Sequence, residues 1–242
     1  SRSFWAWRLQ FRGNIYKAYQ PVDTLVDESY RGQGLFTKMT LNAISEAKEN
    51  GAIMLFNFPN NNSLPSYLKL GWQLIDDIHW YIKISNISKL FSFNLKRSNR
   101  IIIPNNSDIC YPEALESSSI RKTLFCTQWT NDYLRWRFSN DVYHRYRIER
   151  TSSIAIFYSI YKYKGVKELL ILNATIDQKA LNGAINIANH ISGYIAVPAI
   201  SGSRKEEMLR KNGFRKINKH IHFVALPLEN SMKSDVLDKQ NW

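Results

Sequence analysis

The sequence predicts an α/β fold made of two tandem units, with a mixed central sheet, helices on both of its faces and a degenerate second copy. Residues 4–84 alternate strand-like and helix-like segments, an order that gives parallel strands joined by a right-handed helical crossover. Residues 68–72, Leu-Lys-Leu-Gly-Trp, have an echo in residues 210–214, Arg-Lys-Asn-Gly-Phe. Both stretches end a helix with glycine and open a strand with an aromatic ring, which indicates a repeat.

The elements of the first half follow from apolar spacing and turn residues. Arg12-Gly13-Asn14 lies between two apolar runs and predicts a hairpin turn. Gly51 and Gly71 are placed to end helices, and Ser63 is placed to cap the shorter one. The predicted strands are 4–11, 15–26, 52–58, 72–75 and 79–84, and the predicted helices are 35–50 and 63–70.

The second half repeats this order after a polar stretch rich in Asn and Ser. Strands are predicted at 154–163, 168–174 and 194–200, and helices over most of 113–138, at 177–190 and from 203 to 213. Ser203 and Glu206 form a capping-box pattern, in which each side chain satisfies a backbone N–H group at the helix start. The predicted domains are 1–84, a linker at 85–112, a second domain at 113–230 and a polar tail at 231–242.

The stretch from Val26 to Phe36, Val-Asp-Glu-Ser-Tyr-Arg-Gly-Gln-Gly-Leu-Phe, is the most informative in the chain. A strand-like run enters a short loop with two glycines, and an amphipathic helix follows at once. Glycine lets the backbone approach a ligand and turn its N–H groups toward it. The helix start adds unpaired N–H donors at the positive end of the dipole. The pattern favours a pyrophosphate site, with an ordinary glycine-rich turn as the structural alternative.

These residues resemble the GCN5-related N-acetyltransferase (GNAT) superfamily. Residues 31–36, Arg-Gly-Gln-Gly-Leu-Phe, resemble its acyl-CoA signature, Arg/Gln-x-x-Gly-x-Gly/Ala, and residues 62–72 resemble its later Asn … Tyr-x-x-x-Gly-Phe segment. The resemblance covers residues 4–84, while the second half matches in element order only and has no glycine at 174–180. The chain thus resembles a tandem member with one degenerate copy, similar to bacterial enzymes that N-acylate nucleotide-linked amino sugars.

The resemblance implies how acetyl-CoA or another acyl-CoA would bind. Two central parallel strands, 19–26 and 52–58, would separate and hold the pantetheine between them. Backbone amides of the glycine loop would hold the pyrophosphate, and Arg31 would add charge. Phe36 occupies a position where the family prefers Gly or Ala, so its ring must point into the core. The implied cofactor-binding residues are Val26, Arg31, Gly32, Gln33, Gly34, Leu35, Phe36, Phe58 and Asn62.

The resemblance also implies Tyr67 as the general acid. The structural alternative is that Tyr67 is a half-buried residue that only packs against its neighbours. A CoA thiol has a pKa near ~8.5 by analogy with cysteine, so a modest acid suffices to protonate it. A backbone N–H group within 56–58 would donate to the oxyanion. Asp23, His79 and a water relay are the candidates for the base. Asn57 and Asn60 are expected either to contact substrate or to shape their loop.

The net charge of the chain favours negatively charged binding partners, but it does not identify which kind. The chain has 33 Lys and Arg against 20 Asp and Glu, a formal charge of +13, which attracts phosphorylated small molecules, nucleic acid or acidic surfaces. Cys110 and Cys126 are too few for a disulfide framework, which favours the reducing cytoplasm. His220 and His222 share one face of an expected strand, but no third ligand lies nearby in sequence, so no metal is predicted.

The sequence therefore predicts an acyl-CoA-dependent N-acyltransferase that acts on a primary amine. A nucleotide-linked amino sugar used in surface-polysaccharide synthesis is the narrower expectation for the acceptor. Two alternatives stay open: a non-catalytic module that binds nucleic acid, and an aminoacyl-tRNA-dependent transferase. Because the glycine loop is intact, nucleic acid is not the expected partner, and homo-oligomerisation is left open.

Overall fold

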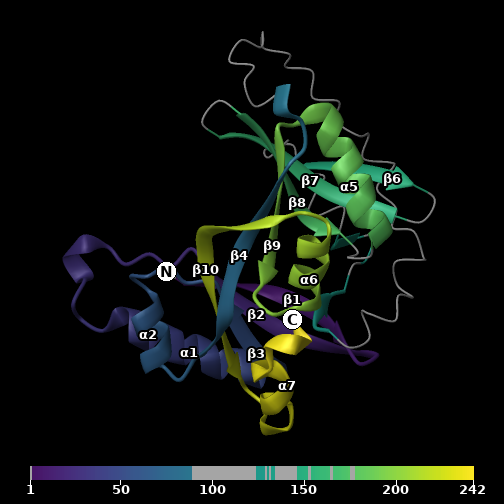
Figure 1. The fold of residues 1–242 in the computed structure, drawn as a ribbon. Coiled ribbons are helices and arrows are strands. Elements are labelled where there is room, and N and C mark those ends of the chain that lie inside the picture. Colours follow the sequence, from purple (N-terminus) through teal and green to yellow (C-terminus); the bar gives the residue numbers. More distant parts are fainter. Residues whose placement is uncertain are drawn as a thin grey trace. The chain divides into compact units, whose positions relative to one another are not determined.

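A computed structural model describes residues 2–88, 124–128, 130, 132–133, 146–151, 154–163, 166–174 and 178–242. These residues divide into two compact units (Figure 1). Unit 1 holds the described residues of 1–78, 119–128 and 220–242, and unit 2 those of 79–118 and 129–219. The sequence analysis assigns 220–230 to the second domain, whereas here they belong to unit 1, because the end of β10 (Arg215–Pro227) pairs with β3 (Ala52–Asn57).

The sheet of unit 1 is mixed. Its strand order is β5-β1-β2-β3-β10, with β1 at Ser3–Phe11, β2 at Asn14–Val22 and β5 at Cys126–Thr127. The pair β2–β3 is parallel, whereas β1–β2, β1–β5 and β3–β10 are antiparallel. β4 (Gln73–Ile84) and β10 each contribute residues to both units. The sequence predicts this arrangement of two parallel strands, β2 and β3, that are connected through a helix.

The first hairpin closes as predicted. Only Arg12 and Gly13 lie between β1 and β2, with φ angles of 47° and 83°. Two successive positive φ angles match the right-handed twist of the flanking strands, which is why two-residue hairpins favour them. This turn sets the register in which Phe4 faces Pro21 and Ser3 faces Val22.

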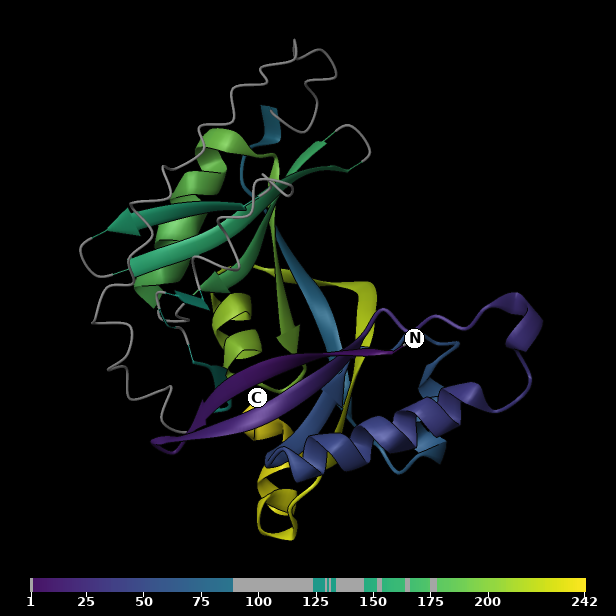
Figure 2. The same cartoon turned by 180° about the vertical axis from the view of Figure 1, so that it is seen from behind.

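Helices cover both faces of β3, as the sequence predicts. Leu55 packs in one core with Ala47 of α1 (Leu35–Glu49) and Tyr67 of α2 (Leu64–Lys69). The neighbouring side chain of Phe56 points to the other face, because side chains alternate along a strand. There its ring lies 6.0 Å from that of Trp242, whose indole N–H donates to the carbonyl of Val236 in α7 (Lys233–Leu237). Figure 2 shows α1 along β3 from behind.

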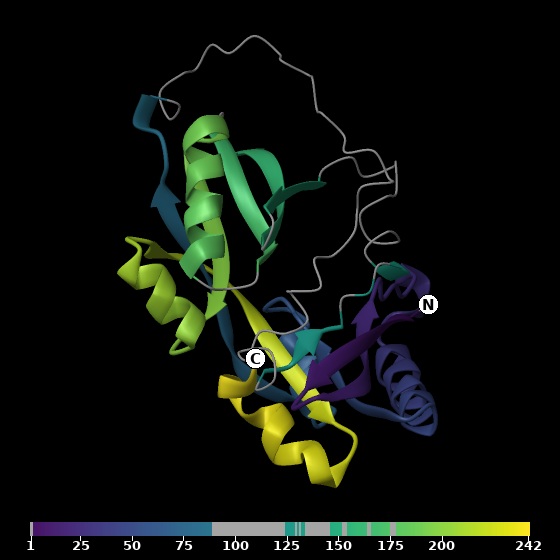
Figure 3. The ribbon, with the colours of Figure 1, turned by 90° about the vertical axis from the view of Figure 1, so that its right-hand side faces the viewer.

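Unit 2 has a similar order of elements. Its strands run β9-β8-β7-β6, with β6 at Tyr146–Thr151, β7 at Ile154–Tyr163, β8 at Val166–Ala174 and β9 at Tyr194–Ile200. The pair β8–β9 is parallel, and β7–β8 and β6–β7 are antiparallel. Helix α5 (Gln178–Ile191) lies against β7, β8 and β9, and α6 (Arg204–Lys211) lies against β9 (Figure 3). A hairpin followed by a helix and a parallel strand thus occurs in each unit.

Several predicted boundaries are wrong. The strand predicted over 15–26 ends at Val22, and the strands predicted at 72–75 and 79–84 are one continuous strand, β4. Residues 126–127, predicted to be helical, form β5 beside β1. The linker residues 89–112 and most of the helix predicted over 113–138 lie outside the described residues.

Both predicted helix caps also differ in detail. The Ser63 hydroxyl makes no cap to α2 and instead donates to Asn60. In α6, Ser203 Oγ accepts from the N–H of Glu206 as predicted, but the Glu206 carboxylate accepts from Gly202 N–H instead of from Ser203 N–H. Among the helices of the described residues, none combines the length and the apolar character needed to cross a bilayer.

Candidate active site

The glycine loop of unit 1 connects β2 to α1. A 3₁₀ turn, Glu28–Tyr30, is capped by Asp27, which accepts hydrogen bonds from the N–H and the hydroxyl of Ser29. These bonds lower the pKa of the Asp27 carboxyl from its usual value. The turn leads into Gly32 and Gly34, whose φ angles are 77° and 71°. Positive φ is strained for most residues with a Cβ atom, so the path of this loop favours glycine at both positions.

The backbone N–H groups of residues 32–37 are available to a ligand. No residue in the described part of the chain accepts a hydrogen bond from them, and the first helical bond of α1 runs from Lys38 N–H to Gly34 C=O. A Cβ atom added at Gly32 or Gly34 would have no atom within 4 Å, so the space beside these amides is open. Open amides at a helix start are the physical basis of an anion site.

Arg31 and Val26 brace the loop. The Arg31 guanidinium donates from Nε to the Val26 carbonyl at 3.3 Å and from Nη1 to Glu28 at 3.2 Å. Its side chain stays 59% exposed, so the guanidinium is accessible to a bound phosphate. Phosphate contact by Arg31 and Val26 stays a prediction, as it does for Gln33 and Leu35.

The parallel strands beside the loop separate. β2 and β3 pair from Lys17 and Ala52 to Tyr19 and Leu55, with a register shift after Lys17. Beyond that point β2 continues to Val22 and stays paired with β1, and β3 continues to Asn57 and stays paired with β10. Within the described residues, the facing edges of β2 and β3 therefore lack a partner strand over their last residues. The resemblance implies an opening between 19–26 and 52–58, and its use by a pantetheine arm stays a prediction.

Tyr67 lies on α2 with its hydroxyl directed toward the end of β3. The residue is 4% exposed, and its oxygen accepts a hydrogen bond from Asn57 Nδ2 at 2.5 Å and another from Arg2 Nη2 at 3.2 Å. Its ring meets those of Phe36 and Trp72 edge to face. Tyr67 thus packs in the core and still presents a polar atom beside the opening.

Phe36 lies as the sequence predicts. Its ring packs against the core that contains Tyr67 and Leu55, so it faces away from the open amides. Arg2 was not predicted as a site residue. Its guanidinium lies 4.8 Å from the Phe36 ring centroid and 5.6 Å from that of Tyr67, and it donates to Thr24 Oγ1. No local pattern marks this residue, because its hydrogen-bond partners are 22 and 65 positions away in sequence.

The other candidate residues from β3 and its loop have different roles. Asn60 shapes the loop: its Oδ1 accepts from the N–H groups of Asn62 and Ser63. Asn62 is otherwise exposed. Phe58 is 38% exposed and stacks on Phe223 at 5.3 Å between ring centroids. Contacts of Phe58 and Asn62 with a cofactor stay predictions.

The two candidate bases lie in different units. Asp23 follows the end of β2, in the loop and not on the strand as predicted, and has a φ angle of 48°. Its side chain is exposed, and a positive φ is tolerated better by Asp than by most residues. His79 lies on β4 in unit 2. Both residues stay predicted candidates for the base.

A family model matches the part of the chain that holds this candidate site. Residues 3–75, which contain the loop, the separated strands and α2, match the family model described as acetyltransferase (GNAT) domain. No curated protein matches the chain in sequence.

Solved structures show the fold. The chain is similar to a GCN5-related N-acetyltransferase from Kribbella flavida, with a TM-score of 0.63, 9% identity and coverage of 94% of this chain and 57% of that one. It is similar to another from Anabaena variabilis, with a TM-score of 0.65, 11% identity and coverage of 94% and 59%. It is also similar to Eis1 from Mycobacterium abscessus, with a TM-score of 0.61, 8% identity and coverage of 98% and 63%. The chain therefore has the mixed α/β fold of GNAT acetyltransferases and spans less than two thirds of these structures.

Proposed function

We propose that unit 1 catalyses transfer of an acyl group from acyl-CoA to a primary amine. The observation that carries the proposal is the row of open amides at residues 32–37, at the start of α1. Such amides stabilise a pyrophosphate through hydrogen bonds and the helix dipole. The match of residues 3–75 to the GNAT domain supports acyl transfer as the reaction class.

The separated strands provide the second part of the cofactor site. In the described part of the chain, the last residues of β2 and β3 lack a partner strand on their facing edges. An acyl-CoA has amide groups in its pantetheine arm, and these can hydrogen-bond to such edges as an added strand does. The arm would thereby direct the thioester toward Asn57 and Tyr67, at the end of β3.

The chemistry requires a nucleophile, an oxyanion donor and an acid. The amine nitrogen forms a bond to the thioester carbonyl carbon, and the carbon–sulfur bond then breaks. A backbone N–H group at 56–58 would donate to the developing oxyanion. The departing thiolate would take the proton of the Tyr67 hydroxyl, and Asp23, His79 or a water relay would take the proton that the amine loses.

A nucleotide-linked amino sugar is the acceptor that we propose within this class. Both substrates would then carry phosphates, and the formal charge of +13 would attract each of them. Acetyl-CoA is the simplest donor, and the acyl chain is part of what the experiment must identify.

The proposal is tested in two steps with the full chain. Isothermal titration with CoA and acetyl-CoA measures binding, and release of free thiol is then followed with simple amines and with nucleotide-linked amino sugars. We expect binding of both coenzymes and amine-dependent thiol release. Absence of CoA binding at millimolar concentration would refute the enzymatic assignment, whereas binding without thiol release for any amine would refute only the proposed acceptors.

A further inference from the structure

Three potential metal ligands meet in unit 1, away from the glycine loop in sequence. Asp77 of β4 and His220 and His222 of β10 have ligand atoms that all lie within 4.8 Å of one another. Asp77 Oδ1 lies 2.7 Å from Nδ1 of His222, and Asp77 Oδ2 lies 3.9 Å from Nε2 of His220. The third ligand that the sequence analysis could not find is therefore supplied by another strand, more than a hundred residues away.

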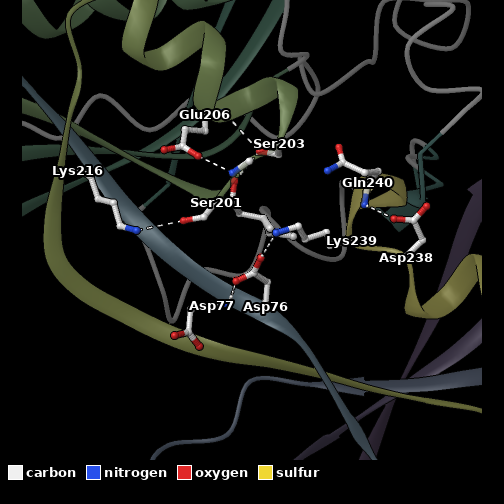
Figure 4. A network of polar contacts seen from close by, with 11 residues as sticks. Asp76, Asp77, Ser201, Ser203, Glu206, Lys216, Asp238, Lys239 and Gln240 are labelled. Atoms are coloured by element: carbon white, nitrogen blue, oxygen red, sulfur yellow. Dashed lines mark hydrogen bonds and ion pairs between the residues drawn. The ribbon is translucent and has the colours of Figure 1, made fainter.

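Strand geometry explains why these three side chains converge. His220 and His222 are two positions apart and so share one face of β10. Asp76 and Asp77 are adjacent and so point to opposite faces of β4: Asp76 accepts a hydrogen bond from Lys239 Nζ at 2.8 Å, and Asp77 points away from it (Figure 4). The lysine therefore forms its ion pair with Asp76, the neighbour of the carboxylate beside the histidines.

The hydrogen bonds leave a place for a cation between Asp77 and His222. Nε2 of His222 lies 2.7 Å from Oδ1 of Asn61, a geometry that suits donation of a ring N–H to the amide oxygen. Nδ1 of the same ring faces an Asp77 carboxylate oxygen at 2.7 Å, so either a proton or a metal ion fits between these two atoms. Among the described residues, no Lys or Arg side chain forms an ion pair with Asp77.

We propose that Asp77, His220 and His222 bind one divalent transition-metal ion, with zinc as the best-fitting ion. Ligand atoms about 2.0–2.1 Å from a tetrahedral zinc lie about 3.3 Å apart, between the two distances above. Two imidazoles and one carboxylate form a donor set that both zinc and iron accept. Magnesium and calcium prefer ligands that are all oxygen, so this donor set disfavours them. The three side chains are 15–36% exposed, which leaves room for water as the fourth ligand.

Asn61 lies where it can orient the ring of His222, one of the proposed metal ligands. A metal-bound histidine commonly donates its second ring N–H to an oxygen atom, which fixes the tautomer and the ring orientation. Asn61 provides that oxygen for His222, and it lies beside Asn62 and Asn60 in the loop after β3. An ion at this site would thus tie β4, β10 and this loop together.

The test measures metal binding directly and is independent of acyl transfer. The full chain is freed of metal with a chelator and is then titrated with Zn²⁺ in competition with a chromophoric indicator, and separately with Co²⁺. We expect one ion per chain, a cobalt absorption spectrum without a thiolate charge-transfer band, and a Tm that rises with zinc concentration.

Variants locate the ion. D77N and H220N should each weaken zinc binding more than ~10-fold, and N61A should weaken it by about 10-fold through the loss of the supporting oxygen. D76N is the matched control, because it removes an adjacent carboxylate that contacts Lys239, and it should keep the affinity of the unchanged chain. His220 is the most exposed of the three ligands, so H220N should fold normally, and circular dichroism checks this.

Two outcomes would overturn the proposal. The first is no zinc or cobalt binding at micromolar protein, in which case a proton on His222 is the shared cation. The second is binding that D77N and H220N leave unchanged, which would place the ion elsewhere, for example on a cysteine.

Discussion

The hydroxyl of Tyr67 has both of its acceptor positions filled. Asn57 Nδ2 and Arg2 Nη2 donate to it, and a tyrosine oxygen accepts at most two hydrogen bonds while it donates one. No described residue receives the hydrogen of this hydroxyl. The two neighbours therefore orient Tyr67 as a donor, which is the role that a general acid requires.

Replacing Tyr67 with Phe tests this role. We expect kcat to fall by about 10²–10⁴-fold, because the thiolate loses its proton donor. The affinity for CoA, measured by titration, should stay within about twofold. The free energy of unfolding should fall by about 1–3 kcal/mol, because Asn57 and Arg2 lose their acceptor. Y16F, on β2 and outside the glycine loop, is the control and should change none of these three quantities. An unchanged kcat in Y67F would remove Tyr67 from the mechanism.

Gly32 allows a matched test of the pyrophosphate site. G32A places a Cβ atom on a residue with a φ angle of 77°, and G13A does the same at 83° in the hairpin turn. Neither Cβ would meet an atom within 4 Å, so both variants carry a similar backbone strain of about 1–2 kcal/mol. Titration should show CoA binding at least ~10-fold weaker in G32A and unchanged in G13A. Equal CoA affinities in the two variants would contradict binding by this loop.

Among the helices and strands, those whose position depends on neighbouring residues are predicted correctly from the sequence. The β1–β2 turn, the start of α1 and the buried β3 are placed correctly, because each depends on glycine positions and on apolar runs within a few residues. Residues 76–78 are left between two predicted strands, whereas β4 runs through them without a break. In the structure, Lys239 and His222 satisfy the carboxylates of Asp76 and Asp77 from distant parts of the chain. Arg2 and β5 were missed for the same reason.

The start of α6 depends on Glu206, and this dependence can be measured. Burial acts to raise the pKa of Glu206, but the Tyr81 hydroxyl, the Gly202 N–H and Arg210 outweigh it and lower the pKa from 4.5 to about 2. Gly202 donates at 2.5 Å and Arg210 Nε at 2.7 Å (Figure 4 shows Glu206 and Ser203). A lowered pKa in the folded state means that the contribution to stability is complete above pH 4.5 and is lost as the pH falls toward 2.

E206Q should therefore remove a pH-dependent part of the stability. Urea unfolding at pH 7 should show a loss of about 3 kcal/mol, and at pH 2 the variant and the unchanged chain should differ by much less. E207Q is the matched control: Glu207 also pairs four residues on, with Lys211 at 2.7 Å, but its side chain is 65% exposed. E207Q should follow the pH dependence of the unchanged chain. A loss in E206Q that is equal at pH 7 and pH 2 would contradict the role of the carboxylate charge.

At the scale of the whole molecule, charge and fold address different questions. The formal charge of +13 is compatible with coenzyme, nucleotide and nucleic acid alike, so it does not decide the substrate. Salt dependence does: nucleic-acid binding weakens by orders of magnitude between low and physiological salt, as counterions are no longer released favourably. CoA binding rests on directed amides and should depend on salt far less.

The two units have a similar order of elements, and this order alone would allow one coenzyme site in each unit. Unit 1 enters its helix through Gly32 and Gly34 with positive φ angles, whereas the sequence before α5, Ala-Thr-Ile-Asp at 174–177, contains no glycine. A residue with a Cβ atom adopts the required backbone only under strain, so the second unit should not hold a pyrophosphate in this way. Titration should give one CoA per chain, and G32A should weaken that single event. Two equivalent sites, or one site that G32A leaves intact, would show that the second unit binds the coenzyme and that the helix-start amides of unit 1 are not what selects it.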